Sequence, residues 1–98
     1  MEDIFKIEQE NNEHNGRFVI KSNNAITGEM SYSWAGTDKF IIDHTEVGTA
    51  FGGKGFGRKL LMEAVAFARK QNVKIIPLCP YAKSVFDKDE SIRDVLFH

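Results

Sequence analysis

Residues 52–61 read Gly-Gly-Lys-Gly-Phe-Gly-Arg-Lys-Leu-Leu, and the pattern of the sequence changes at this stretch. Five glycines fall between Gly48 and Gly57. From Phe56 onward, apolar residues recur at the spacing of one helix face. A glycine-rich loop that leads into a helix brings backbone N–H groups and the positive end of the helix dipole together. The stretch therefore predicts a binding site for an anion.

The half of the chain before this loop predicts antiparallel strands. Turn residues separate short apolar runs, and the strands are expected over 4–8, 18–20, 25–34 and 40–47. Asn23-Asn24 is typical of a two-residue hairpin because asparagine tolerates a positive φ. Gly28 is a candidate bulge. In the third strand, one alternating face is expected to hold Ile26, Met30, Tyr32 and Trp34.

The half after the loop predicts a helix, a strand and further helix. The first helix begins at Phe56, and residues 73–78 form a mostly apolar fifth strand. A strand, a helix and a strand in this order imply a right-handed parallel crossover. Pro80 suits the first position of a second helix with Cys79 as its cap, and residues 87–98 predict a final short helix and tail. The expected fold class is α+β, with residues 1–98 forming a single domain.

Charge and composition narrow the function. The formal net charge is −1 over 98 residues, which argues against a general nucleic-acid binder. A basic stretch from Lys54 to Lys83 favours a small anionic ligand, although a solvated helix face is the alternative. No apolar run reaches the roughly 20 residues of a membrane helix. The single cysteine and the lack of an export signal predict a cytoplasmic protein.

Two common phosphate-binding motifs do not fit the glycine-rich loop. The P-loop pattern matches from Gly48 to Lys54, but Gly55 stands where a serine or threonine must bind magnesium. The dinucleotide pattern G-x-G-x-x-G begins at Gly53 and fails at Arg58.

The loop closely resembles the [QR]-x-x-G-x-[GA] motif of the GNAT acetyltransferases. Gly55 and Gly57 occupy its two small positions, whereas Gly52 replaces the usual glutamine or arginine. Residues 43–47 and 78–83 resemble the small single-domain branch of this superfamily (YjdJ-type, related to the NATD-type proteins). The resemblance implies a mostly antiparallel twisted sheet whose fourth and fifth strands form a parallel, splayed pair, and it implies acetyl-CoA as cosubstrate.

The resemblance also implies where acetyl-CoA binds. Backbone N–H groups of the loop would hold the pyrophosphate, and those of Val47 and Gly48 would face the pantetheine and the thioester. Lys59 or Lys83 is a candidate for the 3′-phosphate. The residues expected to bind acetyl-CoA are Val47, Gly48, Gly52, Gly53, Lys54, Gly55, Gly57, Arg58, Lys59, Cys79, Tyr81 and Lys83.

Four side chains are candidates for catalysis. Cys79 could accept the acetyl group as a thiolate favoured by the helix dipole and Lys83, or it could be a buried cap. His44 could act as general base, assisted or replaced by Glu46, or it could be a structural histidine between sheet and helix. Tyr81 could act as general acid, or it could pack as an aromatic contact. The spacing of these residues does not suit a metal.

The acceptor side is expected to be open. Larger GNAT enzymes enclose it with helices between the first two strands, but here only residues 11–16 join these strands. An open site suits an exposed amine such as a protein lysine or N-terminus. The expected function is N-acetyl transfer from acetyl-CoA to an amine, and the alternative is a non-catalytic module that binds CoA or acetyl-CoA.

Overall fold

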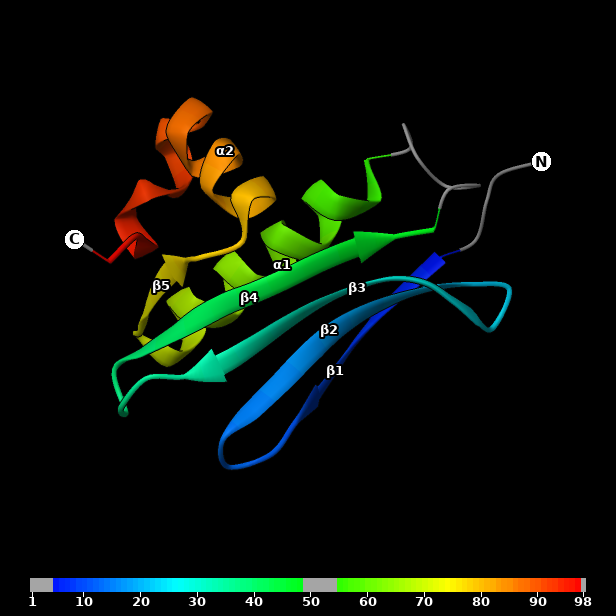
Figure 1. Ribbon diagram of the computed structural model, residues 1–98, viewed down its shortest axis with the longest axis horizontal. Coiled ribbons are helices and arrows are strands. Elements are labelled where there is room, and N and C mark those ends of the chain that lie inside the picture. The colour runs from blue at the N-terminus through cyan, green and yellow to red at the C-terminus, as the bar shows by residue number, and fades with distance from the viewer. Residues whose placement is uncertain (1–4, 49–54, 98) are drawn as a thin grey trace.

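The computed structural model describes residues 5–48 and 55–97 (Figure 1). Strands come first along the chain, and helices dominate the second half, as predicted. The elements are β1 (Phe5–Asn11), β2 (Asn15–Ser22), β3 (Ala25–Trp34), β4 (Lys39–Val47), α1 (Phe56–Gln71), β5 (Lys74–Pro77), α2 (Pro80–Lys88) and the 3₁₀ helix η2 (Glu90–Val95).

The strands form one sheet in the order β1-β2-β3-β4-β5. The first four pair antiparallel, and β4 and β5 pair in parallel. Asn23 and Asn24 have φ values of 54° and 68°, which the turn between β2 and β3 requires. The predicted fold class, a mostly antiparallel sheet with one parallel pair, is confirmed.

All the helices pack on one face of the sheet. Figure 1 shows α1 running behind the strands. Phe18, Met30 and Phe40 of the sheet belong to the same buried cluster as residues of α1, α2 and η2. No helix or strand among the described residues covers the opposite face, which we call the open face. Among the described helices, none combines the length and apolar content that a bilayer crossing requires.

A bulge corrects one prediction for β3. Ile20 of β2 pairs with Gly28, but Lys21 pairs with Ile26, so Thr27 has no partner of its own. The extra residue reverses the alternation of side chains beyond it. Thr27 is therefore buried, whereas Ile26, which was expected on the core face, is 50% exposed.

The C-terminal part also differs from the prediction. Helix α2 continues to Lys88 instead of ending before Asp87, and η2 follows after the single residue Asp89. Phe97 N–H then donates to Ile75 O at 2.9 Å, so the chain returns to the edge of β5.

Candidate functional site

Strand β4 pairs with β5 over only its first half. Strand β5 pairs only with the segment from Lys39 to Ile42. The Cys79 N–H still donates to Ile42 O at 2.9 Å, and the chain then turns into α2. Within residues 5–48 and 55–97, no strand therefore lies beside this edge of residues 43–47. The predicted splay of this parallel pair is confirmed.

The exposed edge of β4 offers the N–H of Val47 and not that of Gly48. The Gly48 N–H donates to Thr27 O of the β3 side at 2.8 Å. Successive residues of a strand direct their N–H groups to opposite edges, so the Val47 N–H faces the gap beyond β5. The prediction that the Gly48 N–H faces the pantetheine is wrong, because β3 already uses this group.

Helix α1 begins at the end of the glycine-rich loop. Gly55 is its N-cap with φ 75°, a left-handed conformation that favours glycine. Lys59 N–H donates to Gly55 O at 3.0 Å, and the N–H groups of Gly57 and Arg58 before it lie in the turn that has no acceptor within the helix. Gly52, Gly53 and Lys54 lie outside the described residues. The start of α1 thus presents the N–H groups of Gly57 and Arg58 at the positive end of the helix dipole.

Cys79 contacts β4 beside the exposed edge. It is 5% exposed, and its Sγ lies 3.3 Å from Oγ1 of Thr45. Burial raises the pKa of the Cys79 thiol, but hydrogen bonds from Thr45 and the backbone of Ala82 and Tyr81 outweigh it, so this pKa lies below its ordinary value. Cys79 is the N-cap of α2, as predicted, yet its side chain makes no capping hydrogen bond.

Tyr81 connects Cys79 with the start of α1. A Cβ at Gly57 would lie 3.1 Å from the Tyr81 ring, so glycine permits this contact. Burial raises the pKa of the Tyr81 hydroxyl, Arg58 lowers it, Cys79 raises it further, and the net direction is upward. Tyr81 is 38% exposed, so the ring packs on Gly57 with one side open to solvent.

The predicted basic residues have partners other than those expected. Arg58 Nη2 binds Asp89 Oδ2 at 2.6 Å and thereby joins the start of α1 to the end of α2. Lys83 Nζ lies 3.4 Å from Asp87 Oδ2 on α2, and Thr45 and backbone groups rather than Lys83 lower the pKa of Cys79. The role of Lys83 toward the 3′-phosphate stays a prediction. Lys59 Nζ lies 4.8 Å from the centre of the Phe5 ring, toward β1.

His44 and Glu46 lie on the open face. His44 pairs with Ser31 and Glu46 with Glu29, and both β3 partners alternate with the buried Met30. The His44 Nε2 lies 3.7 Å from Glu46 Oε2, and the two side chains are 62% and 72% exposed. The alternative of a structural histidine between sheet and helix is wrong, because the helices pack on the other face.

Thr45 is the residue of this site that sequence reasoning missed. It pairs with Met30, which places it on the helix-covered face between His44 and Glu46. Its hydroxyl is the side-chain partner of Cys79. The signal was present in the sequence, since a threonine between two alternating polar residues must face the other side of the strand.

Metal ligation finds no support in this arrangement. No group of three or more His, Cys, Asp or Glu side chains that could hold an ion occurs within residues 5–48 and 55–97. The candidate site combines the first turn of α1, the exposed edge of β4, the Cys79 thiol and the side chains of His44 and Glu46.

Comparisons with known proteins point to one superfamily. The family model described as GCN5-related N-acetyl-transferase matches residues 17–95. The solution structure of a GCN5-like protein from Staphylococcus aureus is 36% identical with a TM-score of 0.71, and the match covers 92% of this chain and 87% of that one. A comparison with curated proteins finds no significant match.

More distant structures share the fold. A ribosomal-protein-alanine N-acetyltransferase from Brucella melitensis is 14% identical with a TM-score of 0.68, and 79% of this chain covers 62% of that one. A GNAT family acetyltransferase from Elizabethkingia anophelis, solved with acetyl-CoA bound, is 16% identical with a TM-score of 0.67 over 78% of this chain and 65% of that one. With the splayed β4–β5 pair and the family model over most of its length, the chain belongs to the GCN5-related N-acetyltransferase family.

Proposed function

We propose that the protein transfers an acetyl group from acetyl-CoA to an exposed amine. The observation that carries this proposal is the exposed edge of β4, which runs from the end of its pairing with β5 at Ile42 to the loop before α1. An extended ligand arm can pair with such an edge as an added strand does. The family membership of the chain supports acetyl-CoA as that ligand.

Acetyl-CoA would bind along the helix-covered side of the gap. The loop and the first turn of α1, at Gly55, Gly57 and Arg58, would hold the pyrophosphate by backbone N–H groups and the helix dipole. The Val47 N–H would bind the pantetheine or the thioester carbonyl. A fixed donor at the carbonyl also stabilises the oxyanion when an amine attacks. Cys79 and Tyr81 would then line the thioester pocket.

The amine would approach from the open face. His44 and Glu46 flank Thr45 on β4 but face the other side of the sheet, so the gap beyond Ile42 connects them with the thioester. His44, or Glu46 in its place, would take a proton from the ammonium, and the free amine would attack the carbonyl. The CoA thiolate would leave and take a proton from Tyr81, whose raised pKa keeps its hydroxyl protonated at neutral pH. The second proton of the acylated nitrogen would then pass through solvent to the tyrosinate and restore Tyr81.

Cys79 offers a second route that uses the same elements. Its thiolate, supported by Thr45, would attack the thioester carbonyl and release CoA, and the acceptor amine would then attack the acetylated Cys79. The two routes differ in one measurable species, an acetyl group on the protein. Direct transfer remains the proposal if that species never forms.

The test measures CoA release and binding side by side. The protein is incubated with acetyl-CoA and a panel of amines, free CoA thiol is measured, and binding of acetyl-CoA is measured separately by calorimetry. Release that depends on an added amine supports transfer. Binding without amine-dependent release would favour a non-catalytic acetyl-CoA module, which the lack of helices between β1 and β2 also allows. If the protein neither binds nor releases, the proposal fails.

A further inference from the structure

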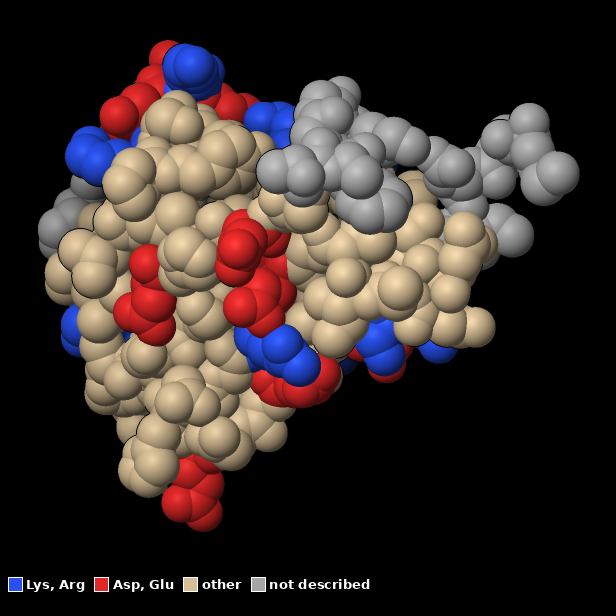
Figure 2. Space-filling model, turned by 45° about the vertical axis from the view of Figure 1, so that its right-hand side comes forward, with Lys and Arg blue, Asp and Glu red and all other residues tan. Residues whose placement is uncertain are grey.

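The open face of the sheet carries a row of carboxylates beside the proposed transfer point. Cross-strand register places Glu8, Val19, Glu29 and Glu46 in one row on this face. Figure 2 shows acidic side chains gathered in the middle of the visible surface. Because no helix covers this face in the described chain, these carboxylates meet whatever approaches the gap from the open side.

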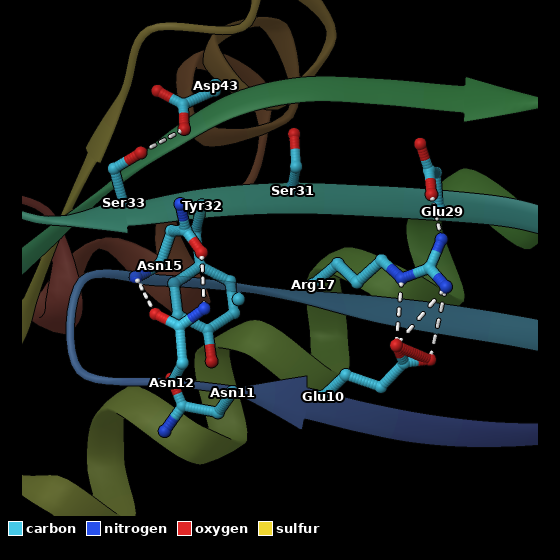
Figure 3. Close-up of a pocket in the computed structure, with 11 residues that line it drawn as sticks. Glu10, Asn11, Asn12, Asn15, Arg17, Glu29, Ser31, Tyr32, Ser33 and Asp43 are labelled. Carbon is cyan, nitrogen blue, oxygen red and sulfur yellow. Dashed lines mark hydrogen bonds and ion pairs between the residues drawn. The ribbon is translucent and has the colours of Figure 1, made fainter.

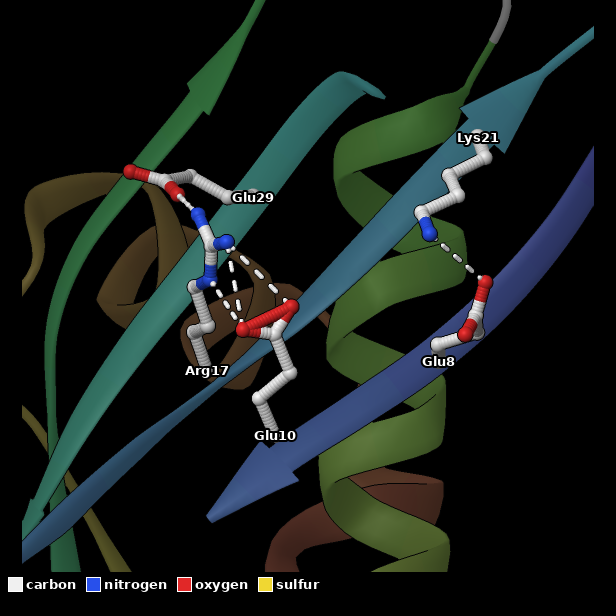
Figure 4. A network of polar contacts seen from close by, with 5 residues as sticks. All are labelled: Glu8, Glu10, Arg17, Lys21 and Glu29. Carbon is white, nitrogen blue, oxygen red and sulfur yellow. Dashed lines mark hydrogen bonds and ion pairs between the residues drawn. The ribbon is translucent and has the colours of Figure 1, made fainter. Parts of the chain in front are cut away.

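The two sides of this face differ in how their charge is balanced. Toward β1, Arg17 binds Glu10 at 3.2 Å and Glu29 at 2.7 Å, and Lys21 binds Glu8 at 3.0 Å (Figure 4). The guanidinium of Arg17 is thus already shared between two carboxylates. The β1 side of the open face is therefore close to neutral.

Toward β4, the negative charge has no basic partner among the described side chains apart from His44. Asp43 Oδ2 accepts from the Ser33 hydroxyl at 2.6 Å, and Glu46 lies only near His44. Glu29 and Glu46 stand directly opposite each other across β3 and β4. Glu29 is already bound by Arg17, whereas Glu46 has only His44 beside it. The charge left to attract a cation is therefore that of Asp43 and Glu46.

The open face is hollowed along β3. A hollow of about 460 Å³ lies at the β1–β2 end and includes Arg17, Glu29 and Asp43 (Figure 3). A second, of about 240 Å³, lies toward the loop and includes Glu29, Glu46 and Gly48. The two hollows share Glu29, and together they form one shallow track along β3 from Ile26 to Ser33. Asp43 and Glu46 of β4 line this track. Neither is an enclosed pocket of the kind that holds small ligands.

We propose that this track binds an extended, positively charged polypeptide segment that presents the acceptor amine. The proposal rests on the proposed acetyl transfer and specifies its substrate class. Lysine or arginine side chains on either side of the acceptor would face Asp43 and Glu46, and the acceptor amine would lie beside His44 at the gap. An extended segment of six residues spans about 20 Å, which suits a ten-residue strand such as β3.

Binding is tested first with a peptide that cannot be acetylated. An N-acetylated, arginine-rich heptapeptide without lysine is titrated into labelled protein, and its glutamate-rich counterpart serves as the matched probe. The basic peptide should shift amide signals at Ser31, Ser33 and His44, and the acidic one should not. Asp43→Asn and Glu46→Gln should each weaken this binding about two- to fivefold, as loss of an exposed ion pair does. Glu63→Gln, an equal charge change on α1, should leave it unchanged.

Transfer is tested with a second pair of peptides. Each has one central lysine, flanked either by arginines or by glutamates. The basic peptide should show the lower KM, the preference should weaken in Asp43→Asn, and 0.5 M salt should reduce it.

The outcomes separate this inference from the proposed function. CoA release with equal use of both peptides would leave acetyl transfer standing and overturn the inference. Charge-selective binding without CoA release would support the surface and contradict transfer. Binding of spermidine as tight as that of the heptapeptide would overturn a polypeptide in favour of a small polyamine.

Discussion

The two halves of β4 belong to one strand but have very different surroundings. In the first half, Phe40 and Ile42 are fully buried, and β5 lies alongside. In the second half, β5 is absent, and His44 and Glu46 are mostly exposed. One strand thus anchors the core at one end and leaves an edge unpaired at the other. The site therefore depends on the position at which β5 ends as much as on the side chains of β4.

The largest effect is expected from the first half. Phe40 is fully buried, and its ring centre lies 5.0 Å from that of Tyr32 and 5.5 Å from that of Trp34. Phe40→Ala should therefore lower the free energy of unfolding by about 3–5 kcal/mol, as measured by chemical denaturation. His44→Ala, four residues along the strand, should change it by less than about 0.5 kcal/mol because its side chain is exposed. Equal losses would contradict the division of β4 into a structural and a functional half.

Variants in the second half of β4 should change the rate of acetyl transfer. If His44 is the general base, His44→Gln should reduce amine-dependent CoA release by about 10²- to 10⁴-fold while acetyl-CoA binding stays unchanged. Glu46→Gln is the companion variant. A larger loss in Glu46→Gln than in His44→Gln would assign the base to Glu46, and full activity in both would place the base elsewhere.

Cys79 lies at the boundary between the two halves, and its variant separates the two routes. Wild-type protein that gains one acetyl mass from acetyl-CoA alone, with Cys79→Ala remaining unlabelled, would establish the covalent route. Because the Cys79 side chain makes no capping hydrogen bond, Cys79→Ala should cost only about 1 kcal/mol of stability through lost packing. If Cys79→Ala acetylates amines as fast as wild type, the Cys79 side chain only lines the thioester pocket.

Much of this division of β4 could be predicted from the sequence, and each prediction that failed has a physical cause. Alternation and turn residues located the strands, and the glycine-rich run located the start of α1. Ile26 was misplaced because one bulge residue, Thr27, reverses the alternation, and periodicity does not reveal that insertion. The Gly48 N–H was misassigned because its direction depends on the partner strand.

Charged side chains were the least predictable part of the site. Arg58 was expected to bind the cofactor, and its ion pair with Asp89 depends on how α2 packs beside α1. The pair of Lys83 with Asp87, in contrast, has the i,i+4 spacing of one helix. Thr45 and Cys79 are 34 residues apart in the sequence, and only the crossover brings them together. Sequence spacing carries no information about such contacts.

Thr45 should control the titration of Cys79. The Thr45 hydroxyl is among the groups that lower the pKa of the Cys79 thiol, so Thr45→Val removes a hydrogen bond to the thiolate and leaves the opposing effect of burial. The midpoint of the pH profile for alkylation should move to higher pH, and Thr45→Ser should restore it. An identical profile in Thr45→Val would mean that the hydroxyl does not act on the thiol.

The smallest effect is expected from the ion pair that holds the start of α1 to the end of α2. Hydrogen bonds from Ser91, and then from Arg58, lower the pKa of Asp89 to about 2 from its ordinary 3.8. A depressed carboxyl pKa contributes stability above the unfolded value, and this contribution disappears as pH falls toward the folded value. Asp89→Asn should therefore be slightly less stable than wild type at pH 6, and the difference should shrink as pH falls from 3.8 to about 2. A difference that persists at pH 2 would have another cause.

The central claim, that acetyl-CoA binds along the exposed half of β4 and the start of α1, is tested most directly by an amide NMR titration. With acetyl-CoA, the largest shifts should occur at Val47, Gly57 and Cys79, while Ile75 and Ile76 of β5 should remain nearly unchanged. Shifts confined to the β1–β2 hairpin, or no shifts at millimolar acetyl-CoA, would contradict the account.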